Sequence, residues 1–317
     1  ATHGRPGPVV VDIPKNVQFA KGAYVSPGAI EHRTYHPRTE PQDRRIEEAV
    51  ALMARAECPV IYSGGGVINS GPAAAEALRA LAKATGWLVM HGSFESNHVM
   101  HDCDVMLCVG ARFDDRVTGR LDKFSPNSRK IHIDIDPSSI NKNVRAEVPI
   151  VADCGKALAA LTRSWSRQVT KAPDLRPWWK QIDAWRARKG FAYPASKSLI
   201  KPQYAIERLY ALTRDRDVYI TTEVGQHQMW AAQFFHFDQP NRWMTSGGLG
   251  TMGYGLPAAI GVQAAFPKSL VIDIAGDASV QMTMQEMSTA VQHNLPVKIF
   301  ILNNEWMGMV RQWQQLL

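Results

Sequence analysis

Long hydrophobic runs are missing from this sequence of 317 residues, although 45% of the residues are hydrophobic. No window of about 18 uncharged apolar residues occurs, so we expect no membrane-spanning helix. The stretch from Ala1 to Pro14 lacks a basic region followed by an apolar one, which argues against a signal peptide. The charged share, 21%, is near the average for globular proteins, and a chain of this length predicts two domains with a sizeable core.

Cysteine is scarce as well, and its spacing excludes two classes of site. Cys58, Cys103, Cys108 and Cys154 show neither metal-ligand spacing nor a disulfide framework. They lie mostly in apolar runs, which predicts buried free thiols in a reducing compartment and therefore a cytoplasmic location.

A concentrated charge of one sign is also absent. The formal net charge is +7, but the Lys and Arg residues are scattered along the chain. A protein that binds nucleic acid usually carries a basic stripe, so we expect neither nucleic-acid nor membrane binding. A mildly positive protein is better suited to small anionic ligands.

Two sets of strand-like and helix-like patterns alternate along the chain. The strand-like runs are short and apolar, and helical patterns or glycine-rich turns separate them: Pro59–Tyr62, Asp104–Val109, Lys130–Ile135, Asp217–Thr222, Ser269–Ile274 and Pro296–Leu302. Strands that alternate with helices indicate parallel sheets covered on both faces. The sequence therefore predicts an α/β protein with two doubly wound parallel-sheet domains. The glycines Gly64–Gly66 after the first run are only a weak nucleotide signal.

Composition changes suggest where these domains begin and end. The run Pro8–Pro14 is strand-like but has no partner nearby, so we expect it to be the last strand of a domain that lies mostly outside this chain. The expected order is residues 1–17 for that strand, 18–42 for a linker, 43–165 for a central domain, 166–200 for a connecting helix and 201–317 for a second domain that ends before its sheet is complete. The Trp-rich stretch 177–191 has helical spacing and predicts a packing helix.

Polar side chains follow two neighbouring strands of the second domain. Asp277 comes directly after one strand, and Asn304 follows the next, with a helix predicted over Met282–His293 between them. Parallel strands of a β-α-β unit end at the same edge of a sheet, so these two side chains should meet there. Carboxylate and amide oxygens suit Mg²⁺, and main-chain amides near a helix N-terminus stabilise anions. An ordinary strand-end turn with polar residues remains the alternative.

Several longer motifs carry a resemblance to one family. They are Gly276–Ser279 followed by Asn303–Asn304, Glu223–Gln228, Ser246–Pro257, Asn304–Trp313, Gly110–Gly119 and His132–Pro137. From about Gly4 to the last residue, the sequence resembles the catalytic large subunit of the acetolactate synthases, which are thiamine-diphosphate enzymes. Ala278 stands where the wider superfamily usually has glycine.

The resemblance implies a site for thiamine diphosphate and Mg²⁺ in residues 201–317. Metal ligands would be Asp277, Asn304 and a main-chain oxygen of Trp306. Met252 would sit beneath the thiazolium ring, with core packing as its alternative role. The remaining implied cofactor contacts are Gln226, His227, Gly250, Gly276, Ala278, Ser279, Gly308 and Met309.

The implied reaction is the first common step of valine, leucine and isoleucine biosynthesis. Pyruvate is decarboxylated, and the two-carbon unit is joined to a second pyruvate or to 2-ketobutyrate. Arg116 would face the carboxylate of the second ketoacid, because a guanidinium pairs well with a carboxylate, and Asp115 would orient it. Trp313 would line the same pocket. A solvated surface turn and an ordinary core position are the alternative interpretations for Arg116 and Trp313.

The central domain of the family binds FAD, which performs no net redox here. The corresponding residues would be His91, Gly92, Arg112, Asp134 and Asp153. The passage from residue 86 to 91 is shorter than the family pattern by roughly two dozen residues that normally line the flavin, and the helix is expected to run almost directly into His91.

The resemblance also implies a homodimer or tetramer with its active site between subunits, together with a regulatory small subunit. The glutamate that activates the cofactor would lie in the domain outside this chain. Neither Glu223 nor Glu286 replaces it, so the chain alone is expected to form no acetolactate. Competing functions are another thiamine-diphosphate carboligase or oxidase, such as glyoxylate carboligase or pyruvate oxidase, and a non-catalytic cofactor-binding module.

Overall fold

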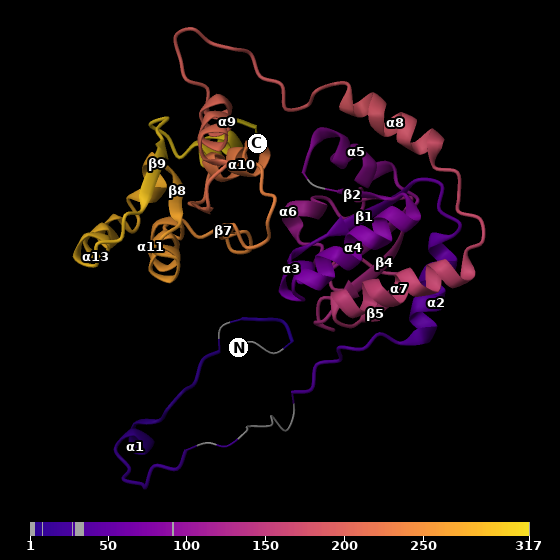
Figure 1. The fold of residues 1–317 in the computed structure, drawn as a ribbon, viewed down its shortest axis with the longest axis horizontal. Coiled ribbons are helices and arrows are strands. Elements are labelled where there is room, and N and C mark those ends of the chain that lie inside the picture. The colour runs from indigo at the N-terminus through magenta and orange to yellow at the C-terminus, as the bar shows by residue number, and fades with distance from the viewer. Residues whose placement is uncertain (1–3, 8, 27, 29–34, 91, 317) are drawn as a thin grey trace. The chain divides into compact units, whose positions relative to one another are not determined.

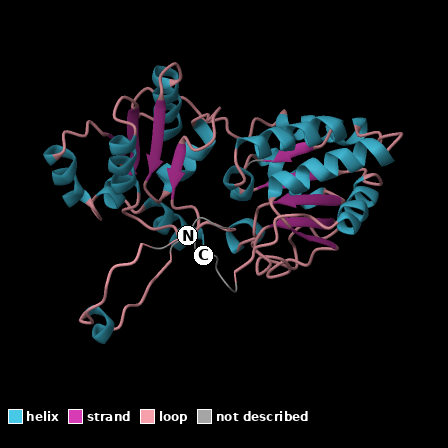
Figure 2. Cartoon of the chain, turned by 60° about the horizontal axis from the view of Figure 1, so that its bottom comes forward, coloured by secondary structure: helices cyan, strands magenta, loops and turns pink. Residues whose placement is uncertain are grey.

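The computed structural model describes residues 4–7, 9–26, 28, 35–90 and 92–316 (Figure 1). The chain divides into two compact units, residues 1–190 and 191–317. Each unit has its own sheet, and the strands of both sheets are visible in Figure 2. The prediction of two parallel-sheet α/β domains is confirmed, because every strand pairing in both sheets is parallel.

The sheet of the first unit has five strands in the order β2-β1-β3-β4-β5. The strands are β1 (Pro59–Ser63), β2 (Leu88–Met90), β3 (Val105–Val109), β4 (Arg129–Asp134) and β5 (Val148–Val151). The strand order reverses between β1 and β3, as in doubly wound folds. β2 pairs with β1, so a short strand precedes His91 where we had expected the helix to run almost directly into it; His91 itself lies outside the described residues.

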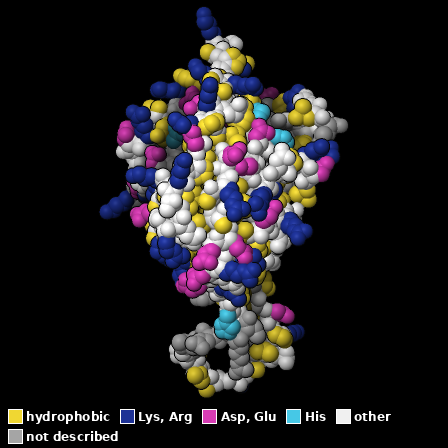
Figure 3. All heavy atoms as spheres, turned by 90° about the vertical axis from the view of Figure 1, so that its right-hand side faces the viewer, with side chains coloured by type: hydrophobic (Ala, Val, Ile, Leu, Met, Phe, Trp, Pro, Cys, Tyr) yellow, Lys and Arg dark blue, Asp and Glu magenta, His cyan; other side chains and the backbone are white. Residues whose placement is uncertain are grey.

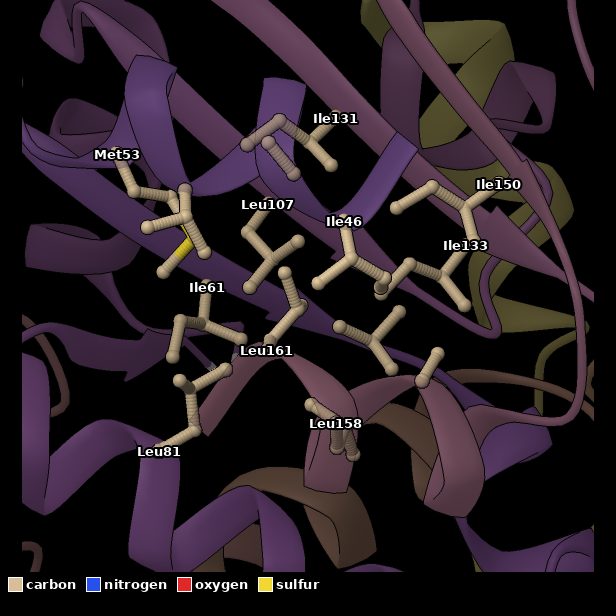
Figure 4. Packing of buried hydrophobic residues seen from close by; sticks show 14 of the residues in the cluster. Ile46, Met53, Ile61, Leu81, Leu107, Ile131, Ile133, Ile150, Leu158 and Leu161 are labelled. Atoms are coloured by element: carbon tan, nitrogen blue, oxygen red, sulfur yellow. The ribbon is translucent and has the colours of Figure 1, made fainter. Parts of the chain in front are cut away.

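Successive residues of a strand point to opposite faces of the sheet, so both faces of this sheet carry apolar side chains. Helices cover both faces. On β3, Leu107 belongs to one buried cluster and Met106 to the other. Figure 4 shows the first cluster, in which Leu107 packs with Ile61 and Leu161. The helices on that side are α2 (Asp43–Met53), α4 (Pro72–Thr85) and α7 (Cys154–Gln168). The second cluster involves α5 (Phe94–Asp102) and α8 (Arg176–Arg186).

Helix α8 packs on the first unit through a buried stripe. Trp178, Ile182 and Trp185 are buried, and Trp178 Nε1 donates a hydrogen bond to the main-chain oxygen of Pro59 at 3.1 Å. The predicted packing helix is therefore present, but it belongs to the first unit. The boundary between the units lies at residues 190 and 191, and residues 187–201 contain neither helix nor strand.

The strand expected at Pro8–Pro14 is not found. Residues 9–14 have no regular structure, and Val9, Val10 and Val11 are exposed. Only the single-turn helix α1 (Lys15–Gln18) follows. An apolar run needs a neighbouring strand for its backbone hydrogen bonds, and the described part of the chain offers none here.

The second unit has four parallel strands in the order β7-β6-β8-β9. The strands are β6 (Val218–Thr222), β7 (Trp243–Thr245), β8 (Leu270–Gly276) and β9 (Lys298–Leu302). Its longer helices are α9 (Pro202–Thr213), α10 (Gln226–Phe234) and α11 (Gly255–Ala265). Along β8, Ile272 and Ile274 pack in the cluster with α9 and α10, whereas Val271 packs with Ala259 of α11. The strand alternation thus places helices on both faces.

The single helix expected over Met282–His293 is broken into pieces. The structure has α12 (Asp277–Val280), the 3₁₀ turn η1 (Met284–Glu286) and α13 (Met287–Gln292). Thr283, with φ −135° and ψ 24°, interrupts the helical backbone. The last helix, α14 (Gly308–Leu316), follows β9.

Charges are dispersed on the face shown in Figure 3, where Lys and Arg are interspersed with Asp and Glu. This agrees with the scattered charge of the sequence. All four cysteines are free, with three buried and Cys58 partly buried. Within the described ranges, no helix combines the length and apolar character needed to cross a bilayer.

Candidate active site

A cavity of about 230 Å³ lies at the carboxyl edge of the second sheet. Its walls come from segments that follow β6, β8 and β9 and from the glycine-rich segment before α11. This is the edge at which ligands bind in open α/β sheets. All of the residues predicted in this unit to contact thiamine diphosphate or metal line it: Gln226, His227, Gly250, Met252, Gly276, Asp277, Ala278, Ser279, Asn304, Trp306, Gly308 and Met309.

Asp277 and Asn304 are brought together by the register of two neighbouring strands. Gly276 pairs with Leu302, so Asp277 leaves β8 beside the point where the chain leaves β9 toward Asn304. Asn304 Oδ1 accepts a hydrogen bond from the main-chain N–H of Trp306 at 3.2 Å, and its Nδ2 lies 3.5 Å from Gln226 Oε1. Both residues line the cavity, so the two strand ends meet at one space.

Two glycines allow the cavity walls to approach each other. A Cβ atom at Gly308 would lie 2.2 Å from Gln226 Oε1 and 2.8 Å from Asn304 Nδ2. A Cβ atom at Gly276 would lie 2.7 Å from His227 Nδ1. Larger residues at these two positions would push polar side chains away from the cavity.

His227 forms a buried part of the wall. Its Nε2 lies 3.4 Å from Ser279 Oγ, which also accepts a hydrogen bond from the main-chain N–H of Gly276 at 3.2 Å. Burial lowers the pKa of His227 to about 4. The imidazole is therefore neutral near pH 7, where it has one N–H to donate and one nitrogen that accepts.

The glycine-rich segment supplies Gly250 and Met252 to the cavity. Gly250 has φ +68°, a left-handed conformation that favours glycine. Ser246 Oγ accepts a hydrogen bond from the main-chain N–H of Thr251 at 3.0 Å, which turns the segment back toward its start. Met252 is partly buried and reaches the cavity from this turn.

The donor set of the cavity suits a hard cation. Within the described part of the chain, no three His, Cys, Asp or Glu side chains form a metal cluster. Asp277 offers a carboxylate, and Asn304 and Gln226 offer amide oxygens, which leaves room for ligand or water oxygens as Mg²⁺ requires. The expected helix N-terminus is only the single turn α12, and Ala278 and Ser279 lie inside it.

The predicted flavin residues of the first unit have partners within the protein. Arg112 forms an ion pair with Asp114 at 3.1 Å. Asp134, whose pKa is raised by burial, accepts a hydrogen bond from the main-chain N–H of Asp136 at 2.8 Å. Asp153 caps α7 by accepting from Lys156 N at 3.1 Å. Of the other two, Gly92 is described but His91 is not.

The glycine turn after β1 serves packing. Gly66 N donates a hydrogen bond to the main-chain oxygen of Gly110 at 3.0 Å. A Cβ atom at Gly66 would lie only 2.6 Å from Gly110 Cα. The turns that follow β1 and β3 are thus in backbone contact, which accounts for these glycines without a nucleotide.

The predicted ketoacid residues are exposed side chains that come from both units. Arg116 and Asp115 are exposed on the short helix α6 (Asp115–Thr118), 3.9 Å apart, and belong to the first unit, whereas the cavity is built from the second. Trp313 is 52% exposed on α14 and is not among the lining residues. Its neighbour Gln312 accepts a hydrogen bond from Gln226 Nε2 at 3.1 Å.

Some lining residues were not singled out in the sequence. They are Val224, Gly225, Trp230, Leu302, Met307 and Val310. Most are sequence neighbours of predicted residues, so proximity to a motif was the available signal. Trp230 lies one helical turn after Gln226 on α10, where only the helical spacing could have indicated it.

Comparison with known proteins identifies both units. Residues 85–161 match the thiamine pyrophosphate enzyme central domain, and residues 223–317 match the C-terminal thiamine pyrophosphate binding domain. The acetolactate synthase isozyme 3 large subunit of Escherichia coli (strain K12) is 45% identical over 341 residues. The acetolactate synthase large subunits of Buchnera aphidicola subsp. Schizaphis graminum and Haemophilus influenzae are 42% and 41% identical.

Each of these alignments covers 100% of the chain and 59% of the relative, so the chain spans about three fifths of their length. The alignment with the Escherichia coli relative is 24 residues longer than the 317 residues of the chain. The relative therefore has about two dozen residues without a counterpart in this chain.

Proposed function

Because the chain belongs to the thiamine pyrophosphate enzymes and is homologous over its full length to acetolactate synthase large subunits, we propose that it serves acetolactate synthesis with thiamine diphosphate and Mg²⁺ in the cavity of its second unit. The supporting observation is that Asp277 and Asn304 leave adjacent strands and line one cavity. The proposed reaction converts pyruvate, with a second pyruvate or 2-ketobutyrate as acceptor.

Mg²⁺ would be held by the carboxylate of Asp277, the amide oxygen of Asn304 and a main-chain oxygen of Trp306. In the structure, Asn304 Oδ1 accepts a hydrogen bond from the main-chain N–H of Trp306, and this bond turns the chain back toward the cavity. An oxygen-only set of this kind, completed by diphosphate oxygens and water, matches the preference of Mg²⁺.

The diphosphate would be met by Gln226 and by the neutral imidazole of His227, each of which has N–H groups to donate. A ligand can approach the main chain closely at the small residues Gly250, Gly276, Ala278 and Gly308. Ser279 Oγ orients His227 through its contact with the ring nitrogen Nε2. Met252 and Met309 add apolar surface for the organic part of the cofactor.

When bound, thiamine diphosphate supplies the electron sink for ketoacid decarboxylation and carbon–carbon bond formation. The residues of the chain bind and orient it and exclude water. Arg116 remains our candidate for pairing with the carboxylate of the acceptor ketoacid, with Asp115 beside it. Trp313 remains the candidate for the acceptor pocket.

For the first unit, FAD is the proposed ligand, because residues 85–161 match the central domain of these enzymes. Arg112, Asp134 and Asp153 lie at or just after the carboxyl ends of β3, β4 and β5, which places them at one edge of the sheet. Yellow colour and flavin absorbance in the purified protein would support this assignment, and their absence after incubation with FAD would contradict it.

The relatives are named as large subunits, and we propose a homodimer or tetramer that also binds a regulatory small subunit. A cytoplasmic location is proposed from the four free thiols.

Calorimetric titration of the chain with thiamine diphosphate, with and without Mg²⁺, tests the binding site. We expect saturable binding that depends on Mg²⁺. Acetolactate formation from pyruvate, measured on the enzyme at its natural length, tests the activity. A protein that binds the cofactor and Mg²⁺ but forms another product from pyruvate would contradict the proposed reaction while leaving the site intact.

A further inference from the structure

Glu223 is a buried carboxylate directly behind the cavity. It follows β6 and has 0% of its surface exposed. Its Oε2 accepts a hydrogen bond from Gly253 N at 2.6 Å, and its Oε1 accepts one from Leu256 N at 3.0 Å. An enclosed carboxylate is costly unless it is hydrogen-bonded, and the free N–H groups at the start of α11 meet this need. Glu223 therefore fastens the glycine-rich segment to the end of β6.

The residue also directly precedes a part of the cavity wall in the sequence. Val224, Gly225 and Gln226, which follow Glu223 directly, line the cavity. One residue thus joins the wall that carries His227 to the segment that carries Met252.

Gly253 is the point through which Glu223 reaches Met252. Its N–H is bound to Glu223, and its carbonyl oxygen accepts a hydrogen bond from Thr283 Oγ1 at 3.1 Å. Its φ is +87°, and an added Cβ atom would lie 2.9 Å from Thr283 Cγ2 and 3.0 Å from Met282 Cβ. The peptide between Met252 and Gly253 is therefore held through its N–H, and the next peptide, between Gly253 and Tyr254, is held through its carbonyl. The two bonds fix the backbone directly after Met252.

We propose that Glu223 is a positioning residue that sets Met252 for contact with the ring system of thiamine diphosphate; this inference rests on the proposed function. Glu223 itself does not line the cavity and acts through the Gly253 peptide. The diphosphate end of the ligand would be met by Gln226, His227 and the Mg²⁺ held at Asp277 and Asn304, whereas the Glu223 carboxylate binds the main-chain N–H groups of Gly253 and Leu256. Loss of the Glu223 carboxylate should therefore weaken recognition of the rings and spare recognition of the diphosphate.

The test compares the binding of two ligands, thiamine diphosphate and inorganic pyrophosphate. Each is titrated by calorimetry into the whole chain in the presence of Mg²⁺. In Glu223→Gln, an amide N–H faces a main-chain N–H, so one charge-assisted hydrogen bond is lost. We expect the Kd for thiamine diphosphate to rise about tenfold or more, and the Kd for pyrophosphate to stay within about twofold. Glu286→Gln is the matched control and should change neither Kd; the Glu286 carboxylate accepts a hydrogen bond from Thr289 Oγ1 at 3.1 Å.

A double-mutant cycle tests the route through Met252. Met252→Ala should show the same selective loss, and Glu223→Gln in that background should add little, because the contact it serves is already gone. Additive losses would overturn the proposal, as would equal losses for the two ligands or wild-type affinity for thiamine diphosphate in Glu223→Gln.

Thr283→Val releases the following peptide, between Gly253 and Tyr254, and should give a smaller loss with the same selectivity. If Glu223→Gln does not fold, Thr283→Val becomes the test of the proposal. Unchanged thiamine diphosphate affinity in Thr283→Val would then count against it. A wild-type chain that binds neither ligand with Mg²⁺ would instead contradict the proposed function.

Discussion

Asp273 and Glu223 are two fully buried acidic residues that converge on one glycine. A Cβ atom at Gly255 would lie 2.3 Å from Asp273 Oδ1 and 2.6 Å from the main-chain nitrogen of Glu223. Thr221 Oγ1 donates to Asp273 Oδ1 at 3.0 Å, whereas Asp273 Oδ2 has no partner among the described residues. The start of α11 is thus packed onto two carboxyl groups, with room only for a hydrogen atom at residue 255.

Asp273 contributes stability that falls as pH rises, whereas the buried His227, with its pKa lowered to about 4, contributes stability that rises with pH. Burial, and next the charge of Glu223, raise the pKa of Asp273 to about 7 from an ordinary value of 3.8. Between these values Asp273 is protonated in the folded chain and ionised in the unfolded chain, so its own contribution makes unfolding easier from about pH 4 to pH 7, by on the order of 4 kcal/mol at most. Asp273→Asn should remove most of this slope. Urea unfolding at pH 5 and pH 8 measures it, and an unchanged slope in the variant would show that Asp273 is not its source.

Gly255→Ala should destabilise the second unit by about 2 kcal/mol or more. The added methyl group would meet Asp273 Oδ1 at 2.3 Å and the backbone of Thr222 and Glu223 at 2.8 Å and 2.6 Å, and backbone atoms cannot move aside cheaply. Gly261→Ala in the same helix is the control. An added Cβ there has nothing within 4 Å, so alanine should stabilise the helix by about 0.5–1 kcal/mol. Thermal unfolding of the two variants should move in opposite directions.

Asp277→Ala should weaken thiamine diphosphate binding about a hundredfold and abolish its dependence on Mg²⁺, because the only carboxylate of the proposed ligand set is removed. Titration with and without a chelator checks this. Asp215→Asn, on an exposed turn with its side chain 89% accessible, should bind as the wild type does. Retention of Mg²⁺-dependent binding in Asp277→Ala would place the ion elsewhere.

Trp178→Ala should lower the unfolding free energy of the first unit by about 3–5 kcal/mol. The side chain is 6% exposed and donates to Pro59, so the change leaves a large cavity and an unpaired carbonyl beneath α8. Trp313→Ala, at a position that is 52% exposed, should change stability by less than about 0.5 kcal/mol. Denaturant unfolding compares the two, and equal effects would argue that α8 is not part of the first core.

The sequence predicted the cavity because its decisive features are local. The apolar strands 270–276 and 298–302 and the parallel β-α-β rule were sufficient to place Asp277 and Asn304 at one edge. The role of Glu223 was not predictable, since its partners lie 30 and 33 residues away and only the packed fold brings them together. The strand expected at Pro8–Pro14 stays a prediction, because the neighbouring strands that it needs were expected to lie outside this chain.

The prediction of one continuous helix over Met282–His293 was wrong for a related reason. The helical pattern there is sound on each side of Thr283, but Thr283 Oγ1 is bonded to Gly253 and its backbone leaves the helical region. Tertiary contact overrides local preference at that residue. Arg116 and Trp313 depended on the family resemblance alone, and the structure adds no contact that assigns them to the cavity.

Every residue that lines the cavity comes after position 190, and the stretch 187–201 contains neither helix nor strand. Within this chain, the residues proposed to bind thiamine diphosphate therefore all belong to the second unit, residues 191–317. A substitution in the core of the first sheet replaces no residue of that cavity wall.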